Sequence, residues 1–478
     1  MIFQQQPLQS TSRWLRQNNK RLLRIIVVLA VAVLSIASPL VLSGNNLVYV
    51  IGIVIGAAGL WFIIRWPAVG LVALIITALL VPSPVLPGGL NFAVLMLVLL
   101  IGLWVLNMIV RKKIDLVSSR PIRPLIALLI VTLLSFGFGQ LGWFSYRAIA
   151  PLEAQVGGVM IFVLSIGAFL LTAHQANLRW LQALTFLFIG LGALFVLGWI
   201  VPSVGSLTGS FFQRPATANS MFWTWLVAMS LGQALFNRKL DRRWRVVLAL
   251  VTIMTLYVAY FKSGSWKSGY LPSFVAIGAI VGARSWRAAL VIALLSVVPA
   301  IFLSSEAIAS DEYSYSTRVD AFLIMWEIIK VSPILGFGPA NYRFFTPLFP
   351  IRGYAVQFNS HNQYLDIVAQ TGIVGLICFL WFGVEMMWLS LTLRNRAAEG
   401  FAQAYVYGAI GGVAGTFAAA MLADWVLPFV YNIGLAGMRG SMLAWIFLGG
   451  VVAIEQITDR QTQESSVVQS LDPSGVTI

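Results

Sequence analysis

The sequence has very little of what many enzyme sites are built from. Its 478 residues include one cysteine and two histidines, and only 10% are charged. The single cysteine, Cys378, has no partner for an internal disulfide, and a cysteine-rich metal site is excluded. His174 and His361 lie far apart in the chain, which disfavours a histidine-based zinc site. We therefore expect neither a metal nor a cofactor.

Apolar residues, by contrast, are abundant. They make up 59% of the chain, and the mean hydropathy of +0.88 is far above that of a soluble domain of this size. A membrane core of about 30 Å requires about 20 apolar residues per helix. The sequence therefore predicts an all-α polytopic membrane protein. Because one of its apolar runs, 270–283, is short, we expect 12–14 transmembrane helices. The fourteen apolar runs are 25–42, 47–64, 67–86, 90–110, 122–141, 155–173, 180–201, 219–236, 246–261, 270–283, 287–304, 362–392, 403–423 and 437–455.

The basic residues indicate how the chain crosses the membrane. Such residues collect on the cytoplasmic side, and with the N-terminus inside, 22 of the 31 fall on inner segments. Most of the net charge of +15 is then explained by the orientation of the chain in the membrane. It predicts contact with the lipid bilayer rather than with nucleic acid. Nine cations on outer segments need another explanation. They are Arg147, Arg214, Lys262, Lys267, Arg318, Lys330, Arg343, Arg352 and Arg439.

This topology divides the chain into five parts. A basic cytoplasmic N-terminus (1–24) precedes an N-terminal transmembrane bundle (25–304), a large periplasmic loop (305–361) and C-terminal transmembrane helices (362–456). The polar segment 457–478 is predicted to be a disordered cytoplasmic tail.

Within the large loop, "RVDAFLIMWEIIK" carries an apolar stripe that predicts an amphipathic helix on the membrane surface. Pro333 ends this helix, and Gly336 and Gly338 turn the chain. The Gly-x-Gly pair is a weak signal for a phosphate cradle, and a simple turn is the favoured interpretation.

The segment "NSHNQYLD" places His361 where this loop becomes an apolar run. "SHNQ" has the form of a capping box, with Ser360 as N-cap and Gln363 three residues later. His361 is then the first helical residue, where the helix dipole keeps the imidazole neutral and able to accept a proton. This geometry suits a general base facing the outer compartment. An interfacial histidine that is hydrogen-bonded to the loop is an equally open interpretation.

The same region carries a resemblance to a known family. "RVDAFLIMWEIIKVSPILGFGPANYRFF" and then "SHNQYLDIVAQTGIVGLICFL" contain an arginine, a tryptophan, Pro-x-x-Gly-x-Gly, His-Asn-x-Tyr-Leu and Gly-x-x-Gly-Leu. Over residues 314–382 this pattern resembles the shared domain of O-antigen ligases and Wzy polymerases. The resemblance implies a metal-independent glycosyltransferase in the bacterial inner membrane. Such an enzyme moves a glycan from an undecaprenyl-diphosphate carrier to a saccharide or glycolipid acceptor hydroxyl, on the periplasmic side.

The resemblance also implies roles for individual residues. His361 is the catalytic base of an inverting displacement, and Arg318 stands at the position of a family arginine that binds the departing diphosphate. Lys267 occupies the place of a second family arginine; lysine keeps the charge but loses the bidentate geometry. Arg343 and Arg352 either guide the diphosphate or solubilise the loop. The candidates for substrate binding are Arg214, Asn362, Tyr364, Arg343 and Arg352.

Two alternatives remain open. Cyanobacterial members of the same superfamily, described as inorganic-carbon transporters, have similar sequences, but transporters usually bury charged groups near the bilayer midplane. In the central parts of the predicted helices Glu385 is the main ionisable residue. The other alternative is a non-catalytic scaffold that docks partners in polysaccharide assembly. His174 lies on an inner segment, away from the predicted chemistry, and is interpreted as structural.

Overall fold

The computed structural model describes residues 59, 61–82, 89–114, 116–262, 267–288, 290–291 and 312–471. In this part of the chain the secondary structure is helical, apart from one isolated bridge between Ile351 and Tyr354. The chain divides into two compact units, Met1–Pro67 and Ala68–Ile478. The predicted span 25–42, most of 47–64 and most of 287–304 lie outside the described residues.

In the described residues, seven helices are long and apolar enough to cross a membrane. Shorter apolar helices and surface helices complete the fold, and the prediction of an all-α polytopic membrane protein is confirmed. The seven are α4 (Phe92–Arg111), α6 (Leu152–Gln175), α7 (Leu178–Ile200), α11 (Arg242–Tyr257) with the π-helix η2 (Val258–Lys262), α16 (Gln363–Leu393), α17 (Phe401–Leu422) and α18 (Gly434–Leu471). The others are α3 (Pro67–Leu79), α5 (Ile122–Phe138), α8 (Pro202–Phe211), α9 (Arg214–Thr217), α10 (Ser220–Phe236), α12 (Lys267–Arg284), α14 (Glu312–Val331), α15 (Tyr342–Phe345) and η3 (Thr346–Leu348).

Small residues bring the central helices of the second unit close together. A Cβ added at Gly232 on α10 would lie 2.7 Å from the carbonyl oxygen of Ala404 on α17. A Cβ at Gly411 on α17 would lie 2.6 Å from the carbonyl oxygen of Ala276 on α12. Because lipid tails are as apolar as the side chains, helices in a membrane associate largely through such close backbone packing. The packing of α10, α12 and α17 follows from it.

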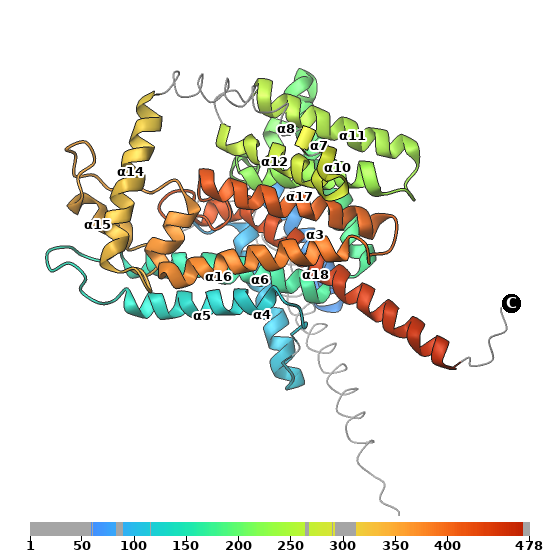
Figure 1. The fold of residues 1–478 in the computed structure, drawn as a ribbon, viewed down its shortest axis with the longest axis horizontal. Helices are drawn as coiled ribbons and strands as arrows, with labels where there is room; N and C mark the ends of the chain where they lie inside the picture. The colour runs from blue at the N-terminus through green and yellow to red at the C-terminus, as the bar shows by residue number, and fades with distance from the viewer. Residues whose placement is uncertain are drawn as a thin grey trace, which may run out of the picture. The chain divides into compact units, whose positions relative to one another are not determined.

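Helix α14 confirms the predicted helix in the large loop. It stands across the direction of α5, α6 and α16, which run side by side (Figure 1). Met325 and Ile328 are fully buried on its inner face, whereas Leu323 and Trp326 on the opposite face are more than half exposed. A helix that is apolar on both faces fits a position between protein and lipid. It ends at Val331, two residues before the proline that was predicted to stop it.

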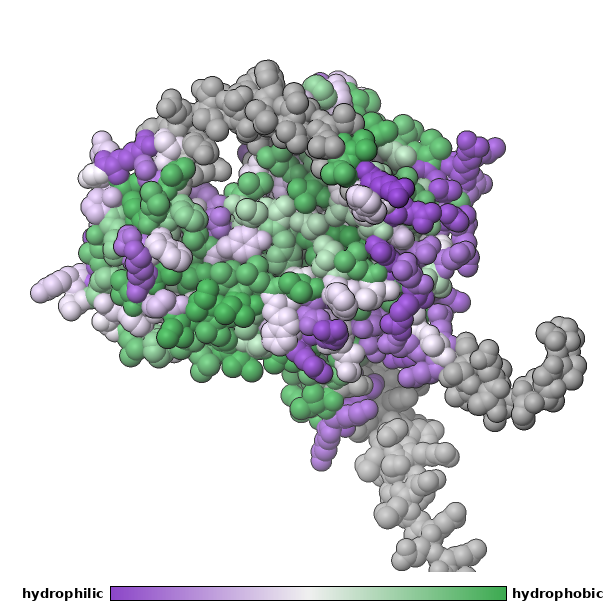
Figure 2. Space-filling view, in the orientation of Figure 1, coloured by the Kyte–Doolittle hydropathy of each residue, from purple (hydrophilic) through white to green (hydrophobic). Residues whose placement is uncertain are grey.

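Cations of two inner segments pair with acids of α16 and α18. Arg120, before α5, lies 3.0 Å from Glu385 of α16, and Arg396 lies 2.6 Å from Asp459 of α18. Figure 2 shows hydrophilic residues gathered at this end of the bundle, where the α10–α11 and α16–α17 connections lie. The carboxylate of Glu385 is therefore paired with a cation from an inner loop.

The C-terminal segment differs from the prediction. Helix α18 continues to Leu471, so residues 457–471 are helical where a disordered tail was predicted. The pairing of Asp459 with Arg396 explains part of the difference, because it ties the helix to the α16–α17 connection.

Candidate functional site

The candidate site is built around a break in α16. At Gly372 the backbone leaves the helical conformation, with φ of 68° and ψ of −176°. The turn that follows α14 fills the break. The amide of Phe337 donates to the carbonyl of Ala369 at 2.9 Å, and the amide of Ile373 donates to the carbonyl of Pro333 at 2.8 Å. The large outer loop and α16 therefore share one hydrogen-bonded joint.

The Gly-x-Gly pair belongs to this joint. A Cβ at Gly336 would lie 2.6 Å from the carbonyl carbon of Gln370, and the amide of Gly338 donates to the carbonyl of the same residue at 2.9 Å. Both glycines have positive φ. These backbone groups are used within the protein, which supports the turn and not the phosphate cradle.

Helix α16 begins at Gln363, and its N-cap is Asn362. The side-chain oxygen of Asn362 accepts hydrogen bonds from the amides of Tyr364 and Leu365 at 3.0 and 3.2 Å. The prediction that Ser360 caps the helix and that His361 is its first helical residue is therefore wrong. His361 precedes the cap, has a φ of 48° and is exposed.

The capping box fails because both of its side chains are engaged elsewhere. The hydroxyl of Ser360 lies 2.8 Å from a carboxylate oxygen of Asp366, and it accepts from the amide of Asn362. The side-chain oxygen of Gln363 accepts from the amide of Leu427, in the α17–α18 loop, at 2.9 Å. Tertiary contacts thus move the cap by two residues and leave His361 outside the helix.

Beneath His361 lies a buried polar network. The Tyr342 hydroxyl donates to Asp366 Oδ1 at 2.5 Å, and the Ser360 hydroxyl is directed at the same oxygen. Burial raises the pKa of the Tyr342 phenol well above its ordinary value, and the Asp366 carboxylate raises it further. Tyr342 therefore stays a donor. The second carboxylate oxygen of Asp366 is buried and accepts no hydrogen bond from the part of the chain that the structure describes.

A second acid, Asp424, lies beside this network. It is fully buried in the α17–α18 loop, where its carboxylate accepts from the amide of Phe429 at 2.7 Å and from the side chain of Asn432 at 2.6 Å. Burial raises the pKa of the Asp424 carboxyl, although these hydrogen bonds lower it. Asp424 also raises the pKa of Tyr342, so the two acids and the phenol form one electrostatic cluster.

Two of the residues predicted to bind substrate also hold helices together. The Asn362 side chain donates to the carbonyl of Met421 at 3.2 Å, in addition to capping α16. The Tyr364 hydroxyl donates to the carbonyl of Phe417 at 2.7 Å. Both contacts join the start of α16 to the end of α17.

The two loop arginines are also engaged within the protein. Arg343 donates to the carbonyl of Tyr431 at 2.9 Å, and its guanidinium carbon lies 5.2 Å from the centre of that ring. Arg352 donates to Asp320 of α14 at 2.7 Å. These contacts fasten the loop, and they support a structural role for Arg343 and Arg352.

Of the remaining cations predicted to bind the diphosphate or the substrate, the structure describes the side chain of one. Arg214 begins α9 and is exposed, and α9 packs against α18. Lys267 is the first residue of α12, and Arg318 lies in the second turn of α14. The side chains of Lys267 and Arg318 are outside the described part of the chain. Their contact with a diphosphate stays a prediction.

The structure assigns clear partners to His174, which was interpreted as structural, and to Arg439, one of the nine outer cations. The Nε2 atom of His174 accepts from the amide of Val117 at 2.7 Å, and its Nδ1 lies 2.7 Å from the carbonyl oxygen of Leu170. These contacts agree with the structural interpretation. Arg439 of α18 is 2% exposed and donates to the carbonyl of Val81, just beyond the end of α3. A cation is stabilised at a helix C-terminus.

Sequence reasoning missed three residues that support His361, and it gave a fourth, Ser360, the wrong role. The three are Tyr342, Asp366 and Asp424. A signal existed for the acids, because an acidic residue in an apolar run marks a functional position in a membrane protein. Asp366 falls in the first turn of such a run, and Asp424 falls directly after one. No comparable signal marked Tyr342, whose burial depends on tertiary packing.

The fold and the site together define a multi-pass membrane protein with a buried carboxylate cluster beneath an exposed histidine. Residues 224–380 match the sequence model of a family described as O-antigen ligase. The matched range includes Lys267, Arg318 and His361. This match confirms the predicted resemblance over that part of the chain. No curated protein matches the chain.

Proposed function

We propose that the protein is a membrane glycosyltransferase of the O-antigen ligase or polymerase type. The observation that carries the proposal is the family match over residues 224–380, which contains His361 as an exposed residue directly before the cap of α16. The donor is a glycan on undecaprenyl diphosphate, and the acceptor is a saccharide or glycolipid hydroxyl. The excess of basic residues on the opposite loops supports an inner-membrane location with His361 on the periplasmic side.

In the proposed reaction His361 removes the proton of the acceptor hydroxyl. The acceptor oxygen then attacks the anomeric carbon of the donor, and the bond from that carbon to the diphosphate oxygen breaks with inversion. The diphosphate leaves with the electron pair, while Lys267 and Arg318 stabilise its charge. General base catalysis of this kind contributes about 10²–10⁴ in rate.

The buried network supports this role for His361. His361 itself lies in a loop at positive φ, so its position depends on the residues on either side. Ser360 is held by Asp366, and Asn362 is held by the first turn of α16 and by Met421. A base that is exposed to substrate yet anchored on both sides meets the geometric demand of proton transfer.

The positions of the buried charges favour the transferase over a transporter. In the part of the chain that the structure describes, the charged side chains that are buried are Asp366, Asp424 and Arg439. All three lie in or next to segments that the topology assigns to the outer side. Glu385, in contrast, is paired with Arg120 from an inner loop. A transport pathway usually places such groups near the bilayer midplane.

The test replaces His361 with asparagine in cells that depend on the protein. Asparagine tolerates the left-handed backbone better than alanine does, so the loop is kept while the base is lost. We expect the pool of undecaprenyl-diphosphate glycan to rise and the transferred product to disappear, at matched protein levels. Gln357→Ala, an exposed change in the same loop, is the control. Normal transfer by His361→Asn contradicts the proposal, and altered solute uptake with an unchanged glycan pool indicates a transporter.

A further inference from the structure

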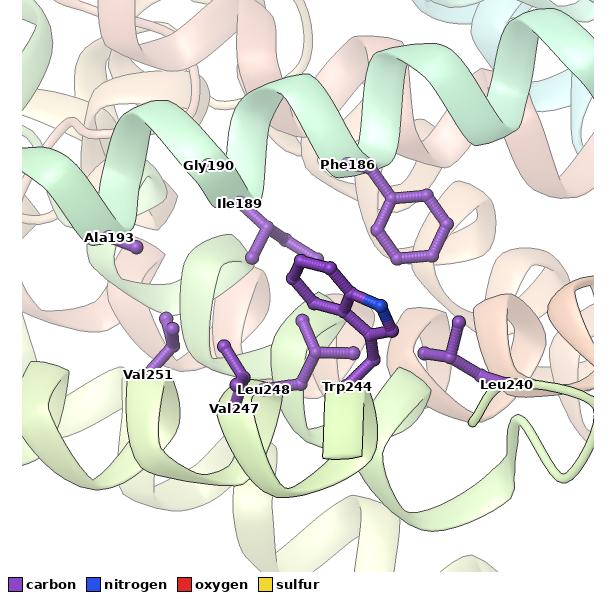
Figure 3. Close-up of a pocket in the computed structure, with 9 residues that line it drawn as sticks. All are labelled: Phe186, Ile189, Gly190, Ala193, Leu240, Trp244, Val247, Leu248 and Val251. Carbon is purple, nitrogen blue, oxygen red and sulfur yellow. The ribbon is translucent and has the colours of Figure 1, made fainter. Parts of the chain in front are cut away.

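A separate cavity lies between α7 and α11, away from His361. It has a volume of about 370 Å³, and every residue that lines it is apolar. Figure 3 shows the side chains of both helices directed into it, with the indole of Trp244 between them. Its lining includes Phe186, Ile189, Gly190, Trp244, Leu248 and Val251. Trp244 and Val247 of this lining are exposed, so the apolar groove is open at the surface of the protein.

The apolar groove lies toward the inner side of the predicted topology. Helix α7 begins at Leu178 and α11 begins at Arg242, each directly after an inner segment. Leu240, from the loop that joins α10 to α11, forms part of its lining. Its position excludes it as an extension of the candidate site, which lies at the opposite ends of the helices.

A polar pocket adjoins the apolar groove. This second hollow, of about 410 Å³, shares Phe186 and Leu240 with the groove. Its other walls include Lys239 and Asn237, and Glu399 is the acid that faces it. The loop and first turn around Lys239 carry five cations against the single acid Asp241. The cations are Arg238, Lys239, Arg242, Arg243 and Arg245.

We propose that the groove and pocket bind one anionic phospholipid of the inner leaflet. One acyl chain lies between α7 and α11, and the phosphate lies at Lys239. Two observations carry the assignment: the apolar groove opens directly onto a polar pocket, and the surrounding charge is positive despite Glu399. Each cation near the surface attracts an anionic headgroup by about 1 kcal/mol. The undecaprenyl donor is a poorer fit, because its diphosphate reacts at the outer side.

The first test fills the groove. Gly190 lines the groove and a Cβ added there meets no atom within 4 Å, so Gly190→Leu is expected to place its side chain in the groove. Gly102 on α4 is equally open and lies outside the groove, so Gly102→Leu is the matched control. Binding of palmitoyl-oleoyl phosphatidylglycerol to the purified full chain in detergent is measured by native mass spectrometry. We expect the affinity to fall about tenfold in Gly190→Leu and to be unchanged in Gly102→Leu.

The second test removes the cation. Lys239→Gln is expected to weaken phosphatidylglycerol binding about fivefold, the equivalent of one surface cation. Its binding of phosphatidylethanolamine, whose phosphate is neutralised by the headgroup's own ammonium, is expected to fall less. Lys113→Gln, an exposed change on another inner segment, is the control.

Three results overturn the proposal. The first is equal lipid binding by Gly190→Leu and Gly102→Leu. The second is equal loss of phosphatidylglycerol binding by Lys239→Gln and Lys113→Gln. The third is displacement of the bound lipid by undecaprenyl phosphate at a lower concentration than phosphatidylglycerol itself requires. The last result assigns the groove to the donor chain. Because the measurement is of lipid binding, it stands or fails independently of glycan transfer.

Discussion

The hydroxyl of Tyr342 donates a 2.5 Å hydrogen bond to Asp366, and both side chains are fully buried. This contact joins the turn after α14 to the first turn of α16. Asp366 in turn holds Ser360, the residue before His361. The buried pair therefore determines where the predicted base is presented, although neither residue is exposed to substrate.

Removal of the Tyr342 hydroxyl is expected to destabilise the protein. Tyr342→Phe leaves the buried Asp366 carboxylate with one donor fewer, which costs about 1–3 kcal/mol in the free energy of unfolding. Thermal and denaturant unfolding of the purified protein measure the change. Tyr354→Phe removes a hydroxyl from a ring that is 70% exposed and is expected to have no effect. Equal stability of the two variants contradicts a structural role for the pair.

Substitution of Gly372 is expected to disrupt the joint between the outer loop and α16. Its φ of 68° and ψ of −176° belong to a region that is essentially restricted to glycine. In addition, a Cβ there would overlap the carbonyl of Ile334. We expect Gly372→Ala to lower the free energy of unfolding by more than about 3 kcal/mol, the sum of backbone strain and displacement of the turn.

Gly353 provides the control for this change. It also has a positive φ, of 83°, but a Cβ at Gly353 meets no atom within 4 Å. Gly353→Ala therefore carries the backbone cost alone, about 1–2 kcal/mol. The excess loss in Gly372→Ala measures the steric contribution of the joint together with the greater backbone strain at Gly372. Equal losses in the two variants contradict the proposed importance of the joint at Gly372.

The charges of Lys267 and Arg318 are expected to act on the departing diphosphate. Lys267→Gln and Arg318→Gln each remove a charged hydrogen bond of about 1.5–3 kcal/mol, or roughly ten- to a hundredfold in rate. Lys267→Arg keeps the charge and is expected to keep most of the activity. The lipid-linked glycan pool in cells reports transfer, and Lys262→Gln, an exposed outer cation, is the control. Similar pools in Lys267→Gln and Lys262→Gln rule out the proposed role of Lys267.

The helices could be predicted from the sequence because a membrane demands long apolar runs. The helix α14 and its end near Pro333 could also be predicted, since an apolar stripe and a proline are local signals. The cap of α16 could not. Ser360 and Asn362 are both good N-caps, and the choice between them depends on Asp366, which draws the serine away.

The break in α16 at Gly372 could not be predicted from the sequence for a similar reason. In the sequence Gly372 belongs to a family pattern, whereas the physical cause of the break is a turn some thirty-five residues earlier in the chain, at Pro333–Gly338. The burial of Asp366 and Asp424 likewise results from elements that meet only in the folded protein. Local patterns therefore located the histidine, and tertiary contacts defined its surroundings.

The shared joint has a consequence for how the protein is assembled. In lipid an unpaired backbone group costs several kcal/mol, and the carbonyls of Ala369 and Gln370 are paired by amides from the turn after α14. On the proposed topology that turn is exported before α16 is synthesised. Insertion of α16 and docking of the exported loop are thus one coupled step in biogenesis, and a protein whose loop fails to dock retains an incomplete span that quality-control proteases of the membrane can recognise.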